Sequence, residues 1–415
     1  MLDIQFIREN AETVAEKTKQ KGMKADIKNL LAVDEKRREL IQTNEKLREQ
    51  RNQLLASNDP SLKPTEAFIS EGRKIRKKIE ESENALAIVD KEYQELLNDV
   101  PNIIPDDTPL GGEESNMVVK QWGTPSNMKT LDHLEWAENK KLVDFERGTK
   151  VAGNKFYFLK GSLVSLEMAL SLYVMEVARQ KEFMPITVPH MVNTRTMNGT
   201  GYLPRGEERQ VYKIEGEDLN LIATAEIPIT GYHSDEIIDE ASLPLLYAGI
   251  SPAYRMEAGA YGKHSRGLYR VHQFNKVELY VFCLPSQSEE WHKKLISLEE
   301  ELCQSLNLPY QLVRIAAGDL GAPAYKKFDI EYWSPVDQTY KELMSCSNIT
   351  DYQARRLNIR YRNKDKKIEY LHTLNGTAAA MSRMMIAIIE NHQNDKGELV
   401  IPEVLLQYMG GVKKI

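Results

Sequence analysis

Charged and aromatic side chains alternate along two segments that flank a short loop. Because alternate residues of a strand point to the same face, Arg255 and Glu257 share one face of the first segment. The second segment has an apolar face with Val277, Leu279 and Val281. Its other face has Arg270, His272, Phe274, Lys276 and Glu278. The pattern predicts a hairpin with one apolar face and one face of fixed charge plus an aromatic ring.

The polar face of this hairpin has the groups that an ATP site needs. A guanidinium binds phosphate or carboxylate through paired hydrogen bonds. A flat aromatic ring can stack on adenine, and a carboxylate can accept a hydrogen bond from the exocyclic amine. A solvated sheet face without a ligand is the alternative, because spacing alone does not separate the two.

A second cation lies in an apolar segment near the C-terminal end. Residues 378–389 are apolar on every side except at Ser382 and Arg383, which predicts a buried segment. A buried guanidinium without a counter-charge is strongly unfavourable, so Arg383 needs an anion. That anion is either a structural Asp or Glu or the phosphate of a ligand.

Three stretches resemble the signature motifs of the class II aminoacyl-tRNA synthetases, and the surrounding sequence resembles their seryl branch, of bacterial type. Residues 254–257 and 272–278 resemble motif 2, residues 183–189 motif 1, and residues 374–383 motif 3. The resemblance runs collinearly over essentially the whole chain. It implies an α+β fold: an N-terminal antiparallel α-helical coiled-coil arm, then a class II antiparallel β-sheet core with flanking helices.

The resemblance also implies roles for the residues of an ATP site. Arg255 is expected to hold the α-phosphate and the serine carboxylate, Glu257 to read adenine, and Phe274 to stack on it. Arg383 is expected on the γ-phosphate, and Arg255 and Arg383 are the expected catalytic residues. The full set expected to bind ATP is Arg255, Met256, Glu257, Val271, Phe274, Glu342, Leu343, Met344, Ser345 and Arg383.

Glu342 and Ser345 resemble the family's Glu-x-x-Ser element, which implies that they hold Mg²⁺. Strict strand alternation places residues three apart on opposite faces. The strand must therefore end or bulge between Glu342 and Ser345 if both contact one ligand. No structural zinc is expected, because the three cysteines are widely spaced: Cys283, Cys303 and Cys346.

A serine pocket follows from the same resemblance. Thr224-Ala225-Glu226, on its own merely a strand end, matches the Thr-x-Glu element of seryl enzymes. The expected serine-binding residues are Thr224, Ala225, Glu226, Arg255, Glu278 and Thr377. Many family members have Gly-Ser-Gly where this chain has Gly376-Thr377-Ala378, and Ser382 stands where many have glycine. Thr377 keeps the hydroxyl, and its extra methyl group makes the pocket slightly smaller.

Heptad spacing predicts the arm. Val33, Leu40, Leu47 and Leu54 recur every seven residues, and a similar apolar repeat runs from Ile75 to Val100 after a break at 57–64. We expect a tRNA-binding domain over 1–100 with its hairpin at about 28–100, a linker over 101–123 and a catalytic domain over 124–415. The second helix also has a basic cluster. Composition alone favours an ordinary solvated face there, whereas the family resemblance implies a surface that contacts tRNA phosphates. The residues of the cluster are Arg73, Lys74, Arg76, Lys77 and Lys78.

Composition restricts the remaining options. The chain has 415 residues, a formal net charge of −6 and 41% hydrophobic residues, so any nucleic-acid surface must be local. No apolar run is long enough for a membrane span, and the first residues do not form a secretory signal. The three cysteines do not form a disulfide framework, so a reducing cytoplasm is the expected compartment. The expected partners are tRNA(Ser), serine, ATP and a second copy of the chain.

The predicted activity is serine–tRNA ligation in two steps, adenylate formation and transfer to tRNA. His272 is a candidate base for transfer, and a structural hydrogen bond is the favoured reading of it. Two other functions stay open: an enzyme that gives its aminoacyl-adenylate to another acceptor, and a non-catalytic coiled-coil interaction protein. The intact arm argues against the first, and the presence of Arg255, Glu342 and Arg383 argues against the second. The sequence also leaves open whether tRNA(Sec) is a substrate.

Overall fold

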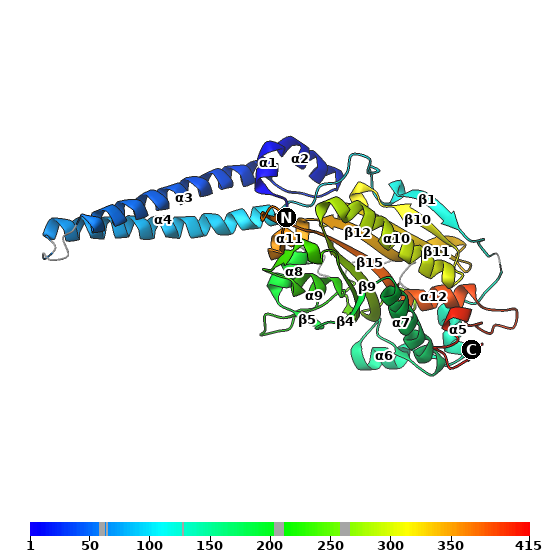
Figure 1. Cartoon of the computed structure of the whole chain (residues 1–415). Coiled ribbons are helices and arrows are strands. Elements are labelled where there is room, and N and C mark those ends of the chain that lie inside the picture. Colours follow the sequence, from blue (N-terminus) through cyan, green and yellow to red (C-terminus); the bar gives the residue numbers. More distant parts are fainter. Residues whose placement is uncertain (58–62, 64, 127, 203–210, 258–265) are drawn as a thin grey trace. The chain divides into compact units, whose positions relative to one another are not determined.

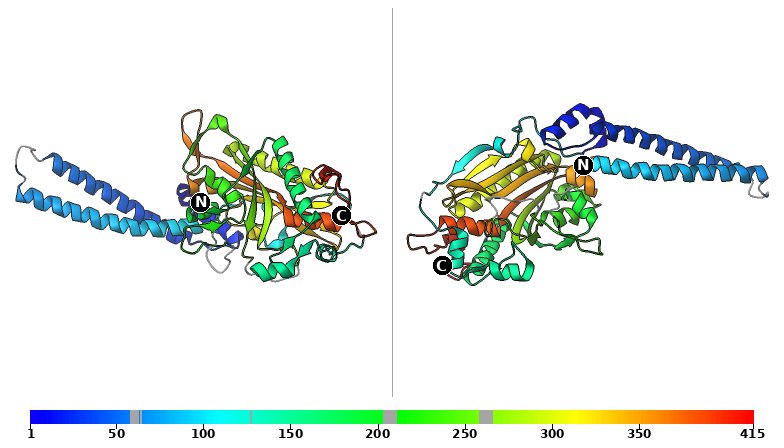
Figure 2. Two further views of the ribbon diagram at one scale, coloured as in Figure 1. Left: turned by 90° about the horizontal axis from the view of Figure 1, so that it is seen from below. Right: turned by 180° about the vertical axis from the view of Figure 1, so that it is seen from behind.

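A computed structural model describes residues 1–57, 63, 65–126, 128–202, 211–257 and 266–415. The chain divides into two compact units, Met1–Ile103 and Ile104–Ile415. Figures 1 and 2 show that the first unit is helical and that the second is built around a large sheet. The α+β class predicted from the sequence is confirmed.

The first unit consists of two short helices and two long antiparallel ones. They are α1 (Ile4–Glu9), α2 (Ala11–Gln20), α3 (Ile27–Ala56) and α4 (Glu66–Asp99). The side chain of Asp26 caps α3 by accepting from the Asn29 amide, and Thr65 caps α4 through the Phe68 amide. At 1.5 Å per residue, the 30 residues of α3 span about 45 Å.

The seam between α3 and α4 follows the predicted repeat most closely near its base. Val33, Val89 and Tyr93 are buried there, whereas Leu40, Leu47 and Leu54 of α3 are only partly buried. In the outer half of the hairpin, α4 still buries Ile75 and Ile79. Near the end of α4 the chain buries Leu97 more deeply than Leu96. Polar residues interrupt the seam: the Arg37 guanidinium lies over the ring of Tyr93, and Asn44 is buried. Such polar positions reduce stability and fix the register of a coiled coil.

The second unit contains an eight-stranded sheet in the order β1-β10-β11-β12-β15-β9-β8-β4. Every neighbouring pair is antiparallel except β4 and β8, which are parallel. The strands of this sheet are β1 (Met117–Trp122), β4 (Met184–Thr187), β8 (Leu245–Tyr254), β9 (Gln273–Cys283), β10 (Tyr310–Arg314), β11 (Lys326–Ser334), β12 (Thr339–Thr350) and β15 (His372–Ala380). Smaller sheets use β2 (Val143–Asp144), β3 (Phe158–Leu159), β5 (Met191–Val192), β6 (Asn220–Leu221), β7 (Ile237–Asp239), β13 (Arg360–Arg362) and β14 (Ile368–Tyr370).

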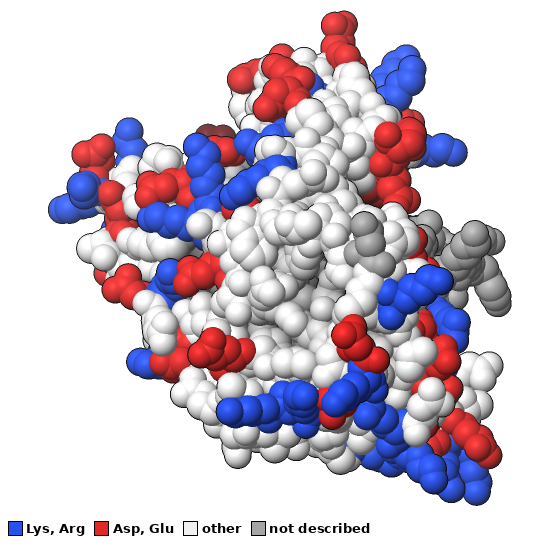
Figure 3. Space-filling view, turned by 90° about the vertical axis from the view of Figure 1, so that its right-hand side faces the viewer, with Lys and Arg blue, Asp and Glu red and all other residues white. Residues whose placement is uncertain are grey.

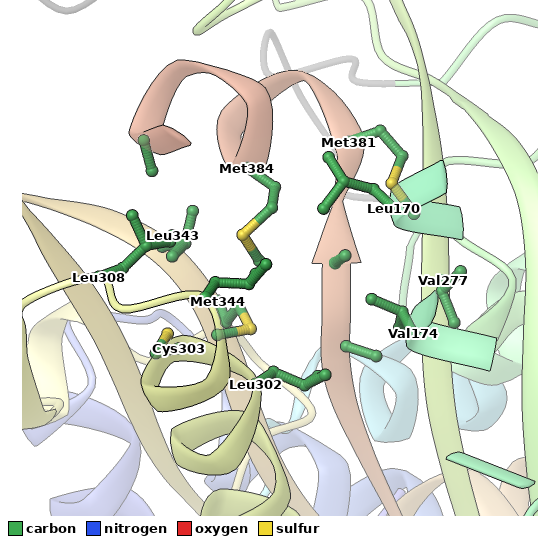
Figure 4. Close-up of a cluster of buried hydrophobic side chains, with 14 of the residues drawn as sticks. Leu170, Val174, Val277, Leu302, Cys303, Leu308, Leu343, Met344, Met381 and Met384 are labelled. Carbon is green, nitrogen blue, oxygen red and sulfur yellow. The ribbon is translucent and has the colours of Figure 1, made fainter. Parts of the chain in front are cut away.

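Helices pack against the sheet. They are α5 (His133–Asn139), α6 (Phe145–Ala152), α7 (Ser162–Gln180), α8 (Thr194–Thr200), α9 (Glu226–Tyr232), α10 (Ser288–Ser305), α11 (Tyr352–Leu357) and α12 (Met381–Asn391). Of these helices, α5, α6, α7, α10 and α12 lie at the main core, and α8, α9 and α11 lie at a second apolar cluster. Figure 4 shows Val174 of α7, Leu302 of α10 and Met384 of α12 meeting in the main core, near Val277 of β9. Residues 378–389 are also buried in this core, as their apolar sequence predicted. Arg383 is the exception and is only partly buried.

One segment differs from the sequence interpretation. Residues 117–122, which lie inside the predicted linker 101–123, form the edge strand β1 and pair with β10. Met117, Val118 and Val119 are exposed, so an apolar core is not what orders this strand. The hydrogen bonds that β10 offers at its free edge order it instead.

Charges of both signs are mixed on the face shown in Figure 3, where they surround a broad area without charged side chains. Among the described helices, none is both long enough and apolar enough to cross a bilayer.

Candidate active site

A cavity of about 370 Å³ opens in the second unit, at the polar face of β9, β12 and β15. Most of the site residues predicted from the sequence line it: Glu226, Arg255, Glu257, Val271, Phe274, Glu342, Leu343, Met344, Ser345, Thr377 and Arg383. Four predicted residues are absent from the described lining: Thr224, Ala225, Met256 and Glu278. The fold therefore gathers residues that are up to about 160 positions apart in the chain around one space.

The predicted hairpin is formed by β8 and β9, and the two faces of β9 divide as expected. Strand alternation does not extend to Arg255 and Glu257, because β8 ends at Tyr254 and Glu257 has a φ of +46°. Val277, Leu279 and Val281 lie in the main core, whereas Phe274 and Lys276 face the cavity. The pairing continues beyond the strands, because the Arg255 amide donates to the His272 carbonyl at 2.9 Å. The Arg255 guanidinium lies 5.4 Å from the centre of the Phe274 ring.

His272 makes a structural hydrogen bond, as the favoured sequence interpretation predicted. Its Nδ1 lies 2.9 Å from the Arg255 carbonyl oxygen, and Nδ1 must donate because a carbonyl oxygen only accepts. The ring also packs against Phe156, with centroids 5.2 Å apart. These two contacts fix the His272 side chain against the backbone of Arg255, whose own side chain lines the cavity.

A β-bulge in β12 places Glu342 and Ser345 on the same side of the strand. Ile330 of β11 pairs with Met344, but the next residue, Glu331, pairs with Glu342, so Leu343 is an extra residue. Leu343 and Met344 are both buried in the main core, and Glu342 and Ser345 both line the cavity. The irregularity that the Glu-x-x-Ser spacing requires is confirmed.

The anion beside Arg383 in this structure is a protein carboxylate. Its guanidinium lies 2.9 Å from Glu342 Oε1 and over the ring of Tyr269, 4.7 Å from the ring centre. Burial raises the pKa of Glu342, but Arg383 and Lys327 outweigh that effect and hold its pKa well below its ordinary value. The structural partner considered from the sequence is therefore present, and Arg383 still reaches the cavity, where a phosphate can approach it.

The donors at the bulge fit a magnesium ion. Mg²⁺ prefers oxygen ligands and is usually bound by one or two carboxylates together with phosphate oxygens and water. Glu342 supplies an ionised carboxylate and Ser345 a hydroxyl, and both face the same cavity. Two basic side chains, Lys327 and Arg383, line the cavity beside them.

Two carboxylates and an amide form a buried network at the other end of the cavity. The Asn375 amide nitrogen donates to Glu226 Oε2 and to Glu278 Oε1, at 3.0 Å in each case. Glu278 is fully buried, pairs with Lys276 and accepts a 3.1 Å hydrogen bond from the Thr224 hydroxyl. Glu278 therefore lies behind Asn375 and Lys276, which are the residues that line the cavity here.

Comparison with known proteins agrees with this arrangement. Residues 1–104 match the seryl-tRNA synthetase N-terminal domain, and residues 210–392 match the tRNA synthetase class II core domain (G, H, P, S and T). A serine–tRNA ligase of Treponema denticola is 45% identical over 99% of this chain and 99% of its own length. The chain belongs to the seryl-tRNA synthetase family.

Solved structures of this family share the whole fold. The seryl-tRNA synthetase of Pyrococcus horikoshii, in complex with ATP, is 38% identical, with a TM-score of 0.90 over 100% of this chain and 99% of its own. The cytoplasmic serine–tRNA ligase of Naegleria fowleri, in complex with AMP, is 33% identical, with a TM-score of 0.86 over 100% of this chain and 98% of its own. The family and fold inferred from the sequence are thus confirmed.

Sequence reasoning missed several residues of this synthetase's cavity. Lys276 lies on the ligand-facing side of β9, so its strand parity was the available signal. Asn375 is two residues from Thr377 on β15 and shares its face, which gave the same kind of signal. Tyr202, Tyr269 and Lys327 also line the cavity and were not predicted as site residues.

Glu226 is expected to make the stability of this synthetase depend on pH. Burial, with the nearby Glu278, raises the pKa of Glu226 from 4.5 to about 7. The folded state then binds a proton more tightly than the unfolded state, so stability falls as pH rises between about 4.5 and 7. Thermal unfolding from pH 5 to pH 8 should show this decline, and Glu226→Gln should flatten it. The quantity to compare is the slope of stability against pH in the wild type and in the variant, because the variant is also expected to be less stable than the wild type at every pH. An unchanged slope in the variant would contradict the assignment.

Proposed function

We propose that this chain is a serine–tRNA ligase that forms seryl-adenylate from serine and ATP and transfers the seryl group to tRNA(Ser). One observation carries the proposal: a single cavity contains Arg255, Arg383 and Phe274 together with the Glu342–Ser345 bulge. The family's serine–tRNA ligases match over the full chain, which supports the same reaction. The N-terminal unit, in this proposal, is the tRNA-binding domain, and the second unit is catalytic.

In the first step, a serine carboxylate oxygen attacks the α-phosphorus of ATP, and the bond to the bridging oxygen of pyrophosphate breaks. The carboxylate is already ionised, so this step needs no general base. We assign its catalysis to alignment and charge neutralisation, with Arg255 holding the carboxylate and the α-phosphate and Arg383 holding the γ-phosphate. Glu257 would accept from the adenine amine, and Phe274 would stack on the ring.

Mg²⁺ would be held by Glu342 and Ser345, where it would neutralise phosphate charge. Serine would be recognised by the network of Glu226, Glu278 and Asn375 together with the Thr377 hydroxyl. A hydroxyl that pairs with buried polar groups gives strong discrimination, because an amino acid without it leaves those groups unpaired. In the second step, a ribose hydroxyl of the tRNA attacks the adenylate carbonyl carbon and AMP leaves.

Acylation of tRNA tests the whole proposal. Purified protein with ATP, Mg²⁺ and labelled serine should convert a tRNA(Ser) transcript to seryl-tRNA, whereas a tRNA(Ala) transcript should stay uncharged. Adenylate formation without transfer to tRNA(Ser) would instead support an enzyme with another acceptor. The absence of both would support a non-catalytic interaction protein.

The basic cluster of α4 is proposed to contact tRNA phosphates. Arg73, Arg76 and Lys77 are exposed, and Ile75 and Ile79 of the same turns are buried, so the cluster includes the face of α4 away from α3. On duplex DNA, each phosphate contact makes the slope of log affinity against log salt concentration steeper by about 0.9. We use the same value for the duplex parts of tRNA, so each lost contact should make the slope shallower by about 0.9. Replacing the three basic residues by alanine should therefore weaken tRNA(Ser) binding and flatten its salt dependence, with amino-acid activation unchanged.

A matched triple variant controls this experiment. Lys150, Lys293 and Lys413 are exposed and lie in the catalytic unit, so their replacement removes the same charge. This control should leave the salt slope of tRNA binding unchanged. Equal effects from both triple variants would show that only net charge matters and would contradict the proposed surface.

The proposed assembly is a homodimer in the cytoplasm. Helix α7 buries one side in the main core, but exposes Met168 and Leu172, which are 61% and 57% accessible, and Met184 of β4 is 60% accessible. Exposed apolar patches often mark protein interfaces. The three cysteines are buried and unbridged, which suits a reducing compartment.

Replacing both Met168 and Leu172 by glutamate should convert the dimer to a monomer, because charge is costly in an apolar interface. Light scattering after size-exclusion chromatography gives the mass directly. Ile88→Glu, a similar change at a 71% exposed site on α4, should leave the dimer intact. A wild-type mass of 47.5 kDa would refute the homodimer.

A further inference from the structure

A buried histidine outside the cavity holds the segment that returns from the β8–β9 loop. His133 begins α5, and its side chain is only 5% exposed. Its Nδ1 lies 2.9 Å from Glu390 Oε1, and its Nε2 lies 3.3 Å from the backbone nitrogen of Leu268. The second oxygen of Glu390 accepts a 2.8 Å hydrogen bond from the Ser334 hydroxyl. The imidazole thus joins α5, α12 and the loop return.

The contacts define where the imidazole proton lies. A backbone N–H only donates, so Nε2 accepts from Leu268 and carries no proton. The proton is then on Nδ1, which donates it to Glu390. Because Glu390 is fully buried, it needs these donors from His133 and Ser334. The Nδ1 atom therefore donates to Glu390, and the Nε2 atom accepts from the Leu268 amide.

The loop backbone is packed directly on the ring. Gly267 has a φ of +61°, and a Cβ at that position would lie 2.4 Å from His133 Nε2. The position therefore requires glycine both for its conformation and for the close approach. The following residue, Leu268, is buried in the main core. The path of residues 267–268 is fixed by His133 on one side and by the core on the other.

This path determines the position of a side chain in the proposed ATP site. Tyr269 follows directly, and its hydroxyl donates to the Glu342 carbonyl oxygen at 3.1 Å. Its ring lies under the Arg383 guanidinium, 4.7 Å away. Glu390 and Arg383 both belong to α12. His133 therefore contacts the helix that carries Arg383 through Glu390 and the segment that carries Tyr269 through Leu268.

We propose that His133 is a positioning residue for adenylate formation, which acts by holding Tyr269 beneath Arg383 and against the Glu342 backbone. The inference rests on the proposed function, because it concerns the arginine and the carboxylate of that site. The contact that matters for the reaction is the one from Nε2 to Leu268. The contact from Nδ1 to Glu390 chiefly supports stability.

Two substitutions separate these tasks. In His133→Gln, the side-chain carbonyl can take the place of Nε2 and accept from Leu268, while the donor to Glu390 is lost. In His133→Asn, the amide can take the place of Nδ1 and donate to Glu390, while the acceptor for Leu268 is lost. Serine-dependent ATP–pyrophosphate exchange gives kcat and KM for each, and thermal unfolding gives the stability.

We expect opposite results from the two variants. His133→Asn should keep its Tm close to that of the wild type and lose about 100-fold in kcat, the size of effect that a misplaced catalytic group can cause. His133→Gln should unfold at a lower temperature but keep kcat within about threefold of the wild type, because the positioning contact that carries the 100-fold effect is retained. A purely structural histidine would make His133→Gln the worse variant in both measurements, and that result would overturn the proposal.

Other outcomes are equally decisive. Equal losses of kcat in both variants would overturn the proposal, as would wild-type kcat in both. If neither variant folds, Gly267→Ala tests the same contact from the loop side; a large loss of kcat in folded protein supports the proposal, and unchanged kcat overturns it. Wild-type protein without serine-dependent exchange would overturn the proposed function itself, a result distinct from the variant effects.

Discussion

Replacing Arg383 by alanine is expected to reduce serine-dependent ATP–pyrophosphate exchange by about 1,000-fold in kcat/KM, which corresponds to about 4 kcal/mol of transition-state stabilisation. The guanidinium is held in place at the cavity by Glu342 and Tyr269, and a preorganised cation of this kind stabilises developing phosphate charge. Its pKa is raised, mainly because Glu342 outweighs the effect of burial, so it is a cation at every working pH. The loss should appear mostly in kcat, because phosphate charge shifts during bond breaking.

The variant must be distinguished from a folding defect. Glu342 lines the cavity, where water can solvate it once Arg383 is removed, so the thermal unfolding temperature should change little. Arg362→Ala, the same change at an exposed position of β13, should leave exchange unchanged. Activity of Arg383→Ala within tenfold of the wild type would show that Arg383 serves only as the structural partner of Glu342.

Glu278→Ala is expected to lose both serine activation and the preference for serine over alanine, the latter by about 100-fold. Glu278 is fully buried and orients Asn375, Thr224 and Lys276, so it shapes the polar end of the cavity from behind. Without it, Asn375 and Lys276 no longer present a fixed pattern of donors to the serine hydroxyl. Exchange kinetics with serine and with alanine give the selectivity ratio.

Stability has to be measured on the same variant. Removal of Glu278 leaves the buried Lys276 without its anion, and breaking a buried pair in this way costs about 3–5 kcal/mol. Glu278→Gln keeps the volume, so it should retain more stability while it still loses selectivity. Glu398→Ala, the same change at a surface pair with Lys414, is the matched control. Near-native activation of serine by folded Glu278→Ala would refute the role.

Periodicity predicted the parts of this molecule in which one face is buried. In β9, the alternation of apolar and polar residues identified both the core side and the cavity side. In β12, the spacing of Glu342 and Ser345 could be satisfied only by an irregular strand, so a bulge was predictable from a resemblance and simple geometry. The coiled coil was predictable for the same reason, since its seam repeats.

Contacts that depend on a third element were not predictable. Glu278 has the strand parity of a ligand-binding residue, but Asn375 from β15 lies between it and the cavity. Strand β1 has little buried surface, so its place at the free edge of β10 gave no hydrophobic signal. His133 contacts residues more than 130 positions away, and only the assembled fold brings them together.

Exchange of pyrophosphate into ATP, measured separately with each standard amino acid, tests the central claim most directly. We predict exchange with serine alone and its loss in Arg255→Ala, whose side chain lies at the cavity beside Phe274. Exchange that depends on another amino acid would contradict the assignment of the pocket. No exchange with folded wild-type protein and Mg²⁺ would contradict the adenylate chemistry itself.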